Sequence, residues 1–347
     1  MAGLTARRVR VLRLLGRMPS VSKIEARRAS HRRSFERFQS IAASQEWKRY
    51  QTLAQYVASG EAEKERQRCE AEKVKFRNTE AYAKLQELKS LSKKRDIAWY
   101  LAQEQKGVFA DLLHERELFF EDFTATDLDT KRWLPRFFWG DALLKKGYSF
   151  VGDPHCYPED NNLEIAGSSL VIETRPDERT ALAWDKVLGF VSERFAYSSG
   201  VVCTGQSFRM LGGRVEVKLR IRHQPGVYHA LYLAGDSRTP QIDVFRTTTG
   251  KKVGLMSGVS RSEANALVPE DGVGALPAGN DYFLLRLDWE GHNLRWSIND
   301  VPYLSMEARG LDTPMYLVFA SGVEPGATPT GVAQMEIDWV RCTAYDA

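Results

Sequence analysis

The chain has 347 residues and a hydrophobic content of 43%, which is enough for about two domains and ordinary for a globular protein. Its net charge of +4 is small, and no stretch approaches the roughly 20 apolar residues of a membrane-spanning helix, so the sequence predicts no transmembrane segment. The four cysteines lie far apart without a CxxC pair, which argues against a zinc site and a dense disulfide framework.

The first residues form a basic segment. Residues 1–40 contain eleven Lys or Arg and two acids, Glu25 and Glu36, so their net charge is +9 and the remainder of the chain totals −5. We assign residues 1–33 to a basic N-terminal arm. Such an arm can contact a polyanion, such as a nucleic acid or anionic lipid, serve as an organellar presequence, or simply be a solvated tail.

The apolar residues of this arm do not form a secretory signal. The stretch from Val9 to Leu15 is interrupted by Arg10 and Arg13, whereas a signal peptide needs about 7–15 uninterrupted apolar residues. We therefore expect a cytoplasmic protein, with the organellar presequence as the alternative.

Residues 34–117 predict a helical domain. They lack proline, contain glycine only at two positions, and are rich in Glu, Lys, Gln, Arg and Ala, which favours helices. Apolar residues recur at helical spacing, as at Tyr82, Leu85 and Leu88, with charged residues on the opposite face. We expect amphipathic helices, and a protein partner could bind their surface.

Two similar helix starts lie within this domain. Ser44 and Thr79 are capping residues that each precede an acidic first turn, and they lie about 35 residues apart. A repeated helix pair and a plain helical bundle both fit this pattern.

Residues 118–347 change to short alternating segments divided by Gly, Asn and Pro, which is typical of an antiparallel sandwich. In the segment 214–221, Val215, Val217 and Leu219 share one face, and charged residues occupy the other. The predicted fold class is therefore an α+β multidomain protein, with an N-terminal all-α region followed by a β-sandwich.

This second region resembles the laminarinase-like glycoside hydrolases of family 16, whose sandwich is a jelly roll of the concanavalin A-like lectin/glucanase type. Each matching string is short, but seven of them occur in the family's order. They are FFEDFTATDLDTKRW at 119–133, NNLEIAGSSLVIET at 161–174, YSSG at 197–200, GGRVEVKLRI at 212–221, GVYHALYLAG at 226–235, LLRLDWEGHNLRWSINDVPY at 284–303 and MEIDWVRCTAY at 335–345.

The resemblance also locates the active-site strand. In the family it reads E-x-D-x-E, or E-x-D-x-x-E where a β-bulge adds a residue, and the two Glu are the nucleophile and the acid/base. Here the segment is QIDVFR. Gln241 occupies the nucleophile position and Asp243 is retained. The acid/base position falls on Phe245 without a bulge, or on Arg246 with one.

These substitutions remove the family's chemistry. A retaining glycosidase needs an ionised carboxylate nucleophile and a second carboxyl about 5 Å away as acid/base. Gln241 carries no charge, and neither Phe245 nor Arg246 can deliver a proton near neutral pH. Asp236 and Asp185 are the nearest alternative carboxylates in the sequence, although neither matches a family position.

The residues near the motif suggest that sugar binding is kept although hydrolysis is lost. The resemblance places Tyr228 and Tyr232 where the family usually carries two tryptophans that line the sugar subsites, and His229 where it carries proline. Tyrosine can still stack on a pyranose ring. Trp184 and Trp139 lie in segments that the family uses at the cleft rim, although each can equally be a packing residue.

No organic cofactor is expected. Family members often carry a calcium ion on the convex face, and Asp338 in the matching MEIDWVR string is a candidate ligand, but one oxygen ligand does not define a calcium site.

The sequence therefore predicts a catalytically impaired family 16-like protein that binds an oligosaccharide or polysaccharide, or serves as an interaction scaffold. Two alternatives stay open. One is an active retaining glycosidase that uses non-standard carboxylates, and the other is a structural or assembly protein that acts through its helices.

Overall fold

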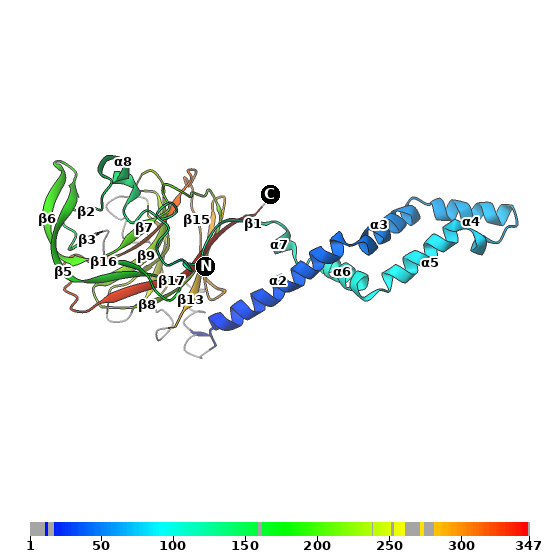
Figure 1. Ribbon diagram of the computed structural model, residues 1–347, viewed down its shortest axis with the longest axis horizontal. Helices are drawn as coiled ribbons and strands as arrows, with labels where there is room; N and C mark the ends of the chain where they lie inside the picture. Colours follow the sequence, from blue (N-terminus) through cyan, green and yellow to red (C-terminus); the bar gives the residue numbers. More distant parts are fainter. Residues whose placement is uncertain are drawn as a thin grey trace. The chain divides into compact units, whose positions relative to one another are not determined.

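The computed structural model describes residues 11–12, 17–158, 162–237, 239–250, 253–260, 271–273 and 281–345. The chain divides into two compact units (Figure 1). One contains residues up to Ile24 and those from Arg116 onward, and the other spans Glu25–Glu115.

The helical unit is held together by aromatic side chains. Phe38 stacks on Tyr100 with ring centroids 4.1 Å apart, and Trp47 lies 4.0 Å from the same tyrosine. The expected caps form, because the side chains of Ser44 and Thr79 accept hydrogen bonds from backbone amides three residues later. The helices are α2 (Val21–Ala43), α3 (Gln45–Ala58), α4 (Glu61–Ala71), α5 (Glu80–Ser92), α6 (Arg95–Lys106) and α7 (Ala110–Leu113), with the 3-10 helix η1 (Phe76–Asn78).

The boundaries of the basic arm differ from those expected. The sequence analysis placed residues 1–33 in an arm and began the helical domain at 34, but α2 already begins at Val21. Val21 and Ile24 are buried against Leu284, and Asn299 donates its amide to the carbonyl of Pro19 at 3.0 Å. The contacts of Pro19, Val21 and Ile24 thus fix the C-terminal part of the basic arm on the sandwich. Within the described residues, no helix combines the length and the apolar character needed to cross a membrane.

The second unit is a sandwich of two sheets whose long strands pair antiparallel, which confirms the predicted fold class; only the short strands β2 and β3 pair in parallel among the described residues. The larger sheet has the order β15-β14-β13-β8-β17-β5-β6-β3, with β1, β2 and β4 pairing beside this path, and the smaller sheet has the order β12-β11-β10-β9-β16-β7. The strands are β1 (Glu115–Glu121), β2 (Ser149–Phe150), β3 (His155–Cys156), β4 (Leu163–Ile165), β5 (Leu170–Asp185), β6 (Gly189–Ser198), β7 (Val201–Cys203), β8 (Gly213–Arg222), β9 (Val227–Ala234), β10 (Gln241–Thr247), β11 (Leu255–Ser260), β12 (Asp271–Val273), β13 (Phe283–Glu290), β14 (Asn293–Ile298), β15 (Val301–Glu307), β16 (Tyr316–Val323) and β17 (Ala333–Tyr345).

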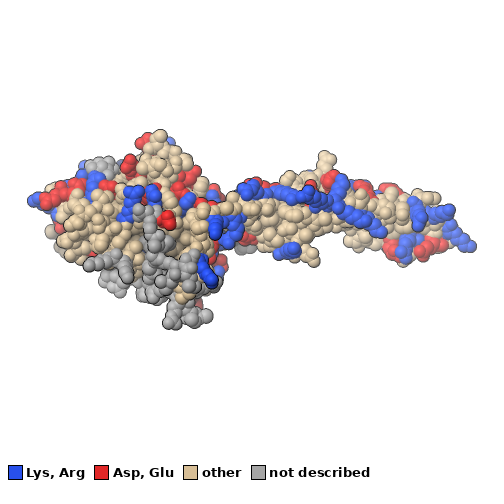
Figure 2. All heavy atoms as spheres, turned by 90° about the horizontal axis from the view of Figure 1, so that it is seen from below, with Lys and Arg blue, Asp and Glu red and all other residues tan. Residues whose placement is uncertain are grey.

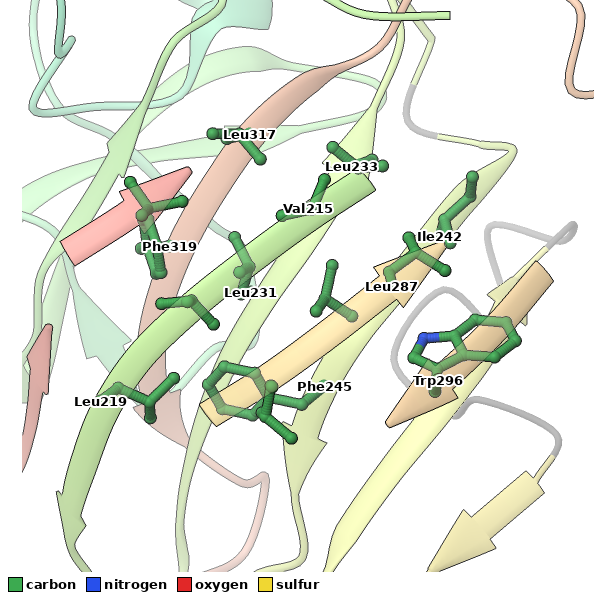
Figure 3. Close-up of a cluster of buried hydrophobic side chains, with 14 of the residues drawn as sticks. Val215, Leu219, Leu231, Leu233, Ile242, Phe245, Leu287, Trp296, Leu317 and Phe319 are labelled. Carbon is green, nitrogen blue, oxygen red and sulfur yellow. The ribbon is translucent and has the colours of Figure 1, made fainter. Parts of the chain in front are cut away.

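The core lies between the two sheets (Figure 3). The alternation predicted for 214–221 is that of β8, whose apolar residues face inward. Buried side chains from both sheets meet there, each 1% exposed or less. The labelled members are Val215, Leu219, Leu287 and Trp296 from the larger sheet and Leu231, Leu233, Ile242, Phe245, Leu317 and Phe319 from the smaller one.

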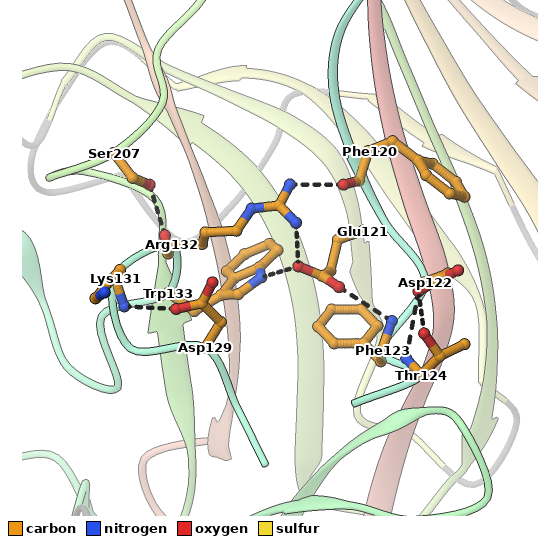
Figure 4. A network of polar contacts seen from close by, with 10 residues as sticks. All are labelled: Phe120, Glu121, Asp122, Phe123, Thr124, Asp129, Lys131, Arg132, Trp133 and Ser207. Carbon is orange, nitrogen blue, oxygen red and sulfur yellow. Dashed lines mark hydrogen bonds and ion pairs between the residues drawn. The ribbon is translucent and has the colours of Figure 1, made fainter. Parts of the chain in front are cut away.

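A network of hydrogen bonds connects the first strand of the sandwich to the loop that follows it (Figure 4). The carboxylate of Glu121 accepts hydrogen bonds from Arg132 at 2.7 Å, from the indole of Trp133 at 3.3 Å and from the amide of Phe123 at 3.2 Å. Arg132 also donates to the carbonyl of Phe120 at 2.6 Å. One carboxylate therefore joins the end of β1 to the loop that carries the fully buried Trp133.

We expect Glu121→Ala to lower the free energy of unfolding by about 2 kcal/mol, because it leaves the indole and guanidinium without their acceptor. Urea denaturation of the full chain measures the change. Glu117→Ala is the matched control, since Glu117 is 52% exposed and contacts only Arg341 among the ion pairs of the described residues. We expect that control to change stability by less than about 0.5 kcal/mol. Equal effects of the two substitutions would contradict this role of Glu121.

Candidate functional site

The strand β10 carries the degenerate motif, and a β-bulge decides how its side chains are distributed. Opposite β9, Asp243 pairs with Tyr232 while Phe245 pairs with the next residue, Leu231, so Val244 is the extra residue. The bulge interrupts the alternation of faces. Phe245 joins the core, and Arg246 lines the same small cavity as Gln241. The sequence left Phe245 and Arg246 as alternatives for the family's acid/base position, and of the two the bulge turns Arg246 toward the cavity lined by Gln241.

Arg246 is a buried cation. It is 3% exposed, and its guanidinium carbon lies 4.2 Å above the ring of Tyr228, which is a stabilising cation–π contact. Its Nε and Nη1 atoms are buried without a hydrogen-bond partner in the described structure. By the resemblance, this is the position of the family's acid/base, and it holds a guanidinium here.

Asp243 is fully buried beside this cation. Its carboxylate accepts hydrogen bonds from the amide of Gln241 at 3.0 Å and from the hydroxyl of Ser260 at 3.5 Å. Burial raises the pKa of Asp243 to about 6, and Arg246, Gln241 and Ser260 oppose that rise. Gln241 therefore serves as a hydrogen-bond donor to Asp243, a role that an ionised glutamate could not fill.

The space in front of this strand is nearly closed. The cavity has a volume of about 40 Å³, which at roughly 10–15 Å³ per water holds about three waters and no pyranose ring. Tyr228 and Tyr232 were predicted to line sugar subsites, and both line this cavity but are only 8% and 6% exposed. The other lining residues are Phe137, Trp139, Phe150, Asp153, Tyr157, Gln241, Arg246 and Ala320.

A chain of buried hydrogen bonds supports the wall of this cavity. His155 Nε2 lies 2.9 Å from the hydroxyl of Tyr157, which lies 3.3 Å from that of Tyr228. The Nδ1 atom of His155 accepts the amide of Val323 at 3.2 Å, and burial lowers the pKa of His155 to about 3, so the ring is neutral. A Cβ at Gly322 would lie 2.4 Å from His155 Nε2, so the contact requires glycine there.

His229 lies outside the cavity lining, contrary to the expectation that it contacts a ligand. It is fully buried, its Nδ1 lies 2.7 Å from the hydroxyl of Ser321, and burial lowers its pKa to about 3. Its backbone amide donates to the hydroxyl of Thr247. His229 is thus a packing residue on the buried strand β9.

A larger groove adjoins the closed cavity. It has a volume of about 810 Å³ and shares Trp139, Phe150 and Asp153 with the small cavity. The groove brings together Trp139 and Trp184, the two residues that the sequence offered as candidates for the cleft rim. Its lining residues come from the end of the β5–β6 hairpin and from the segment that contains the short helix α8 (Asp141–Leu144) and the 3-10 helix η2 (Phe138–Gly140).

Sequence reasoning missed several residues of this groove. Tyr148, Phe150 and Phe190 add aromatic surface, and the ring of Phe190 lies edge-on to Trp184 at 4.9 Å. Asp153 contributes a carboxylate at the junction with the small cavity. The density of aromatic residues between 137 and 150 is the signal that could have pointed to this segment.

The alternative carboxylates have structural partners. Asp236 is 80% exposed and pairs with Arg209 at 2.7 Å. Asp185 accepts the amides of Val187 and Leu188, each at 2.7 Å, and these bonds lower its pKa. Asp185 thus caps the hairpin turn, so neither residue supports the alternative of an active glycosidase.

The proposed calcium ligand is also engaged. Asp338 pairs with Lys218 at 2.8 Å. Across the described ranges, no group of three or more His, Cys, Asp or Glu side chains could hold a metal ion. Calcium at Asp338 remains an expectation from the resemblance.

Comparison with known proteins identifies the fold. No family model matches the sequence. The catalytic domain of an endo-1,3-β-glucanase (laminarinase) from Thermotoga petrophila is 18% identical, with a TM-score of 0.53, over 67% of this chain and 99% of that one. SCLam, a non-specific endo-β-1,3(4)-glucanase from family GH16, is 17% identical with a TM-score of 0.51, over 67% of this chain and 92% of that one. The sandwich therefore has the fold of the family 16 laminarinases.

A curated relative agrees with this fold. Glucan endo-1,3-β-glucosidase A1 from Niallia circulans is 25% identical over 268 residues, which is 64% of this chain and 36% of the relative. The chain thus spans about a third of the length of the curated relative that it matches.

The buried carboxyl of Asp243 leads to a prediction about pH. Because its folded-state pKa is raised to about 6, the stability that the protonated form contributes is present below the unfolded pKa of about 4 and is lost as pH rises through 6. Asp243→Asn removes this loss. The difference in free energy of unfolding, variant minus natural chain, should therefore rise by about 3 kcal/mol between pH 4 and pH 7.

Urea denaturation of both proteins across this range measures the difference. His155 and His229 titrate in the same way in both proteins and cancel. A difference that falls as pH rises would show that Arg246 outweighs burial and that the pKa of Asp243 is lowered.

Proposed function

We propose that this protein is a catalytically impaired relative of the family 16 laminarinases that binds a glycan without hydrolysing it. The observation that carries the proposal is the pair of groups at the two catalytic positions, an amide at Gln241 and a guanidinium at Arg246, in a cavity of about 40 Å³. The two carboxyl groups that a retaining mechanism needs are replaced, and the cavity is too small for a sugar ring.

Each step of the double displacement would fail at this site. The amide of Gln241 cannot form a glycosyl ester, and it already donates its hydrogen to Asp243. A guanidinium such as that of Arg246 is too weak an acid to protonate the leaving oxygen near neutral pH. Asp243 is the one motif carboxylate left, and it is fully buried beneath these two side chains.

The adjoining groove supports the binding part of the proposal. Its volume of about 810 Å³ accommodates several sugar rings, and Trp139, Phe150 and Trp184 offer apolar faces on which a pyranose can stack. Asp153 and Lys186 provide polar groups beside these faces. The glycan would therefore bind next to the closed cleft rather than in it.

An assembly role is a second candidate, and it is favoured by the charge of the helical unit. Figure 2 shows Lys and Arg side chains gathered in a row along this unit. Part of this charge is neutralised within the unit, since Arg37 pairs with Asp96 and Arg49 with Glu87, both at 2.6 Å. The remaining basic surface would suit an acidic protein or another polyanion.

The first prediction for this function is that the purified protein releases no reducing ends from laminarin. The variant Gln241→Glu/Arg246→Glu restores both carboxyls and should cleave an activated aryl glycoside weakly at best, because positioning errors of about 1 Å can cost a hundredfold. Each single substitution should stay inactive, since the mechanism needs both groups. Laminarin hydrolysis by the natural chain, abolished by Asp243→Asn, would contradict the proposal.

The second prediction concerns the groove. Trp184→Ala and Trp139→Ala should each weaken binding of a laminari-oligosaccharide at least about tenfold in isothermal titration calorimetry, because each removes a stacking surface. Leu211→Ala is the control, since Leu211 is 57% exposed and does not line the groove. If the natural chain binds neither laminari-oligosaccharides nor other glycans on an array while remaining folded, the assembly role stands instead.

A further inference from the structure

The rim of the aromatic groove exposes an unusual amount of aliphatic surface. Ten large apolar side chains are exposed in the described part of the chain, and five of them lie at this rim. Val187 is 89% exposed, Leu143 83% and Leu188 75%, and these are the three highest values of the ten. The other two are Val151 and Trp184, which line the groove.

Two loops carry the three most exposed of these residues, Val187, Leu188 and Leu143. One is the turn of the β5–β6 hairpin, which joins Asp185 to Gly189, and the other is the end of the short helix α8, where Leu143 lines the groove together with Trp184. Figure 1 shows α8 and β2 beside the end of this hairpin. We propose that these two loops, the rim loops, dock on an anionic lipid surface.

The rim loops present their apolar tips without needing to refold. Asp185 holds the hairpin turn by accepting the amides of Val187 and Leu188, each at 2.7 Å, which directs these residues away from the β5–β6 strands. At the other loop, Asp141 is bound to Arg136, and Lys145 ends α8 in the left-handed conformation with a φ of 50°. A pre-formed apolar tip loses little conformational entropy when it enters a lipid interface.

The charges at the rim suit a negatively charged surface. Lys145 and Lys146 follow Leu143 and Leu144, Lys186 precedes Val187, and all three lysines are exposed. The acids of the same loops, Asp141 and Asp185, are half-buried and engaged with Arg136 and the turn amides. Lysine stems can lie along apolar surface while their ammonium groups contact lipid phosphates.

A lipid surface fits these features better than a glycan or a protein partner. Sugar rings stack on aromatic faces inside the groove and leave Val187 and Leu188 in water. A protein partner requires one complementary shape, whereas two separate aliphatic tips flanked by lysines and a tryptophan match the layered chemistry of a bilayer interface. The inference does not depend on whether the groove holds a sugar.

The experiment uses the full chain and two sets of vesicles, phosphatidylcholine alone and phosphatidylcholine with an equal part of phosphatidylserine. We expect binding to the mixed vesicles in a sedimentation assay. Val187→Asp and Leu188→Asp should each lower the partition coefficient about tenfold, because a charge replaces an inserted apolar group. Val332→Asp is the matched control, since Val332 is 49% exposed and does not line the groove, and it should bind like the natural chain.

The basic residues before Glu25 can draw the chain to anionic vesicles by charge alone, so a second readout reports on the rim itself. Lipids brominated in the acyl chain quench a tryptophan that reaches the apolar layer. Quenching should be strong in the natural chain and clearly weaker in Trp184→Phe. Absence of binding, binding unchanged by Val187→Asp and Leu188→Asp, or quenching unchanged by Trp184→Phe would each overturn the proposal. So would a dimer in sedimentation velocity that Leu188→Asp dissociates, if the vesicles are not bound.

Discussion

The β-bulge at Val244 determines which side chains of β10 face the core and which face the small cavity. The chemistry of that cavity depends on this distribution. The bulge sends Phe245 into the core between the sheets and turns Arg246 toward the cleft beside Gln241. Without the bulge, Arg246 would point into the packed core, where a guanidinium has no room and no water. The sequence of this strand therefore tolerates arginine only in the bulged register.

Arg246 and Asp243 depend on one another in the closed cleft. Removing a charge from water costs several kcal/mol unless an opposite charge or strong dipoles compensate it. Arg246 is compensated by the ring of Tyr228 and by the carboxylate of Asp243, while burial raises the pKa of Asp243 to about 6. Gln241 completes this arrangement by donating to Asp243. Asp243 thus has a structural role beside the buried arginine.

The sequence predicted the features that depend on residues close together in the chain. The alternation of β8, the caps at Ser44 and Thr79 and the order of the family strings all follow from local patterns, and the fold class is confirmed. The bulge could be named only as an alternative, because the register of β10 is set by its pairing with β9. The groove was missed in large part, since Tyr148 and Phe190 lie far apart in sequence and meet only through the β5–β6 hairpin. The arm boundary was misplaced for the same reason, because Val21 is buried by the distant Leu284.

Trp139, Phe150 and Asp153 line both the closed cavity and the open groove, so the two spaces share a wall. Arg246, Tyr228 and Tyr232 fill the small cavity and support this wall on one side. The aromatic faces of the wall are thereby held toward the groove on the other side. One set of buried side chains therefore fills the small cavity and lies behind the aromatic wall of the groove.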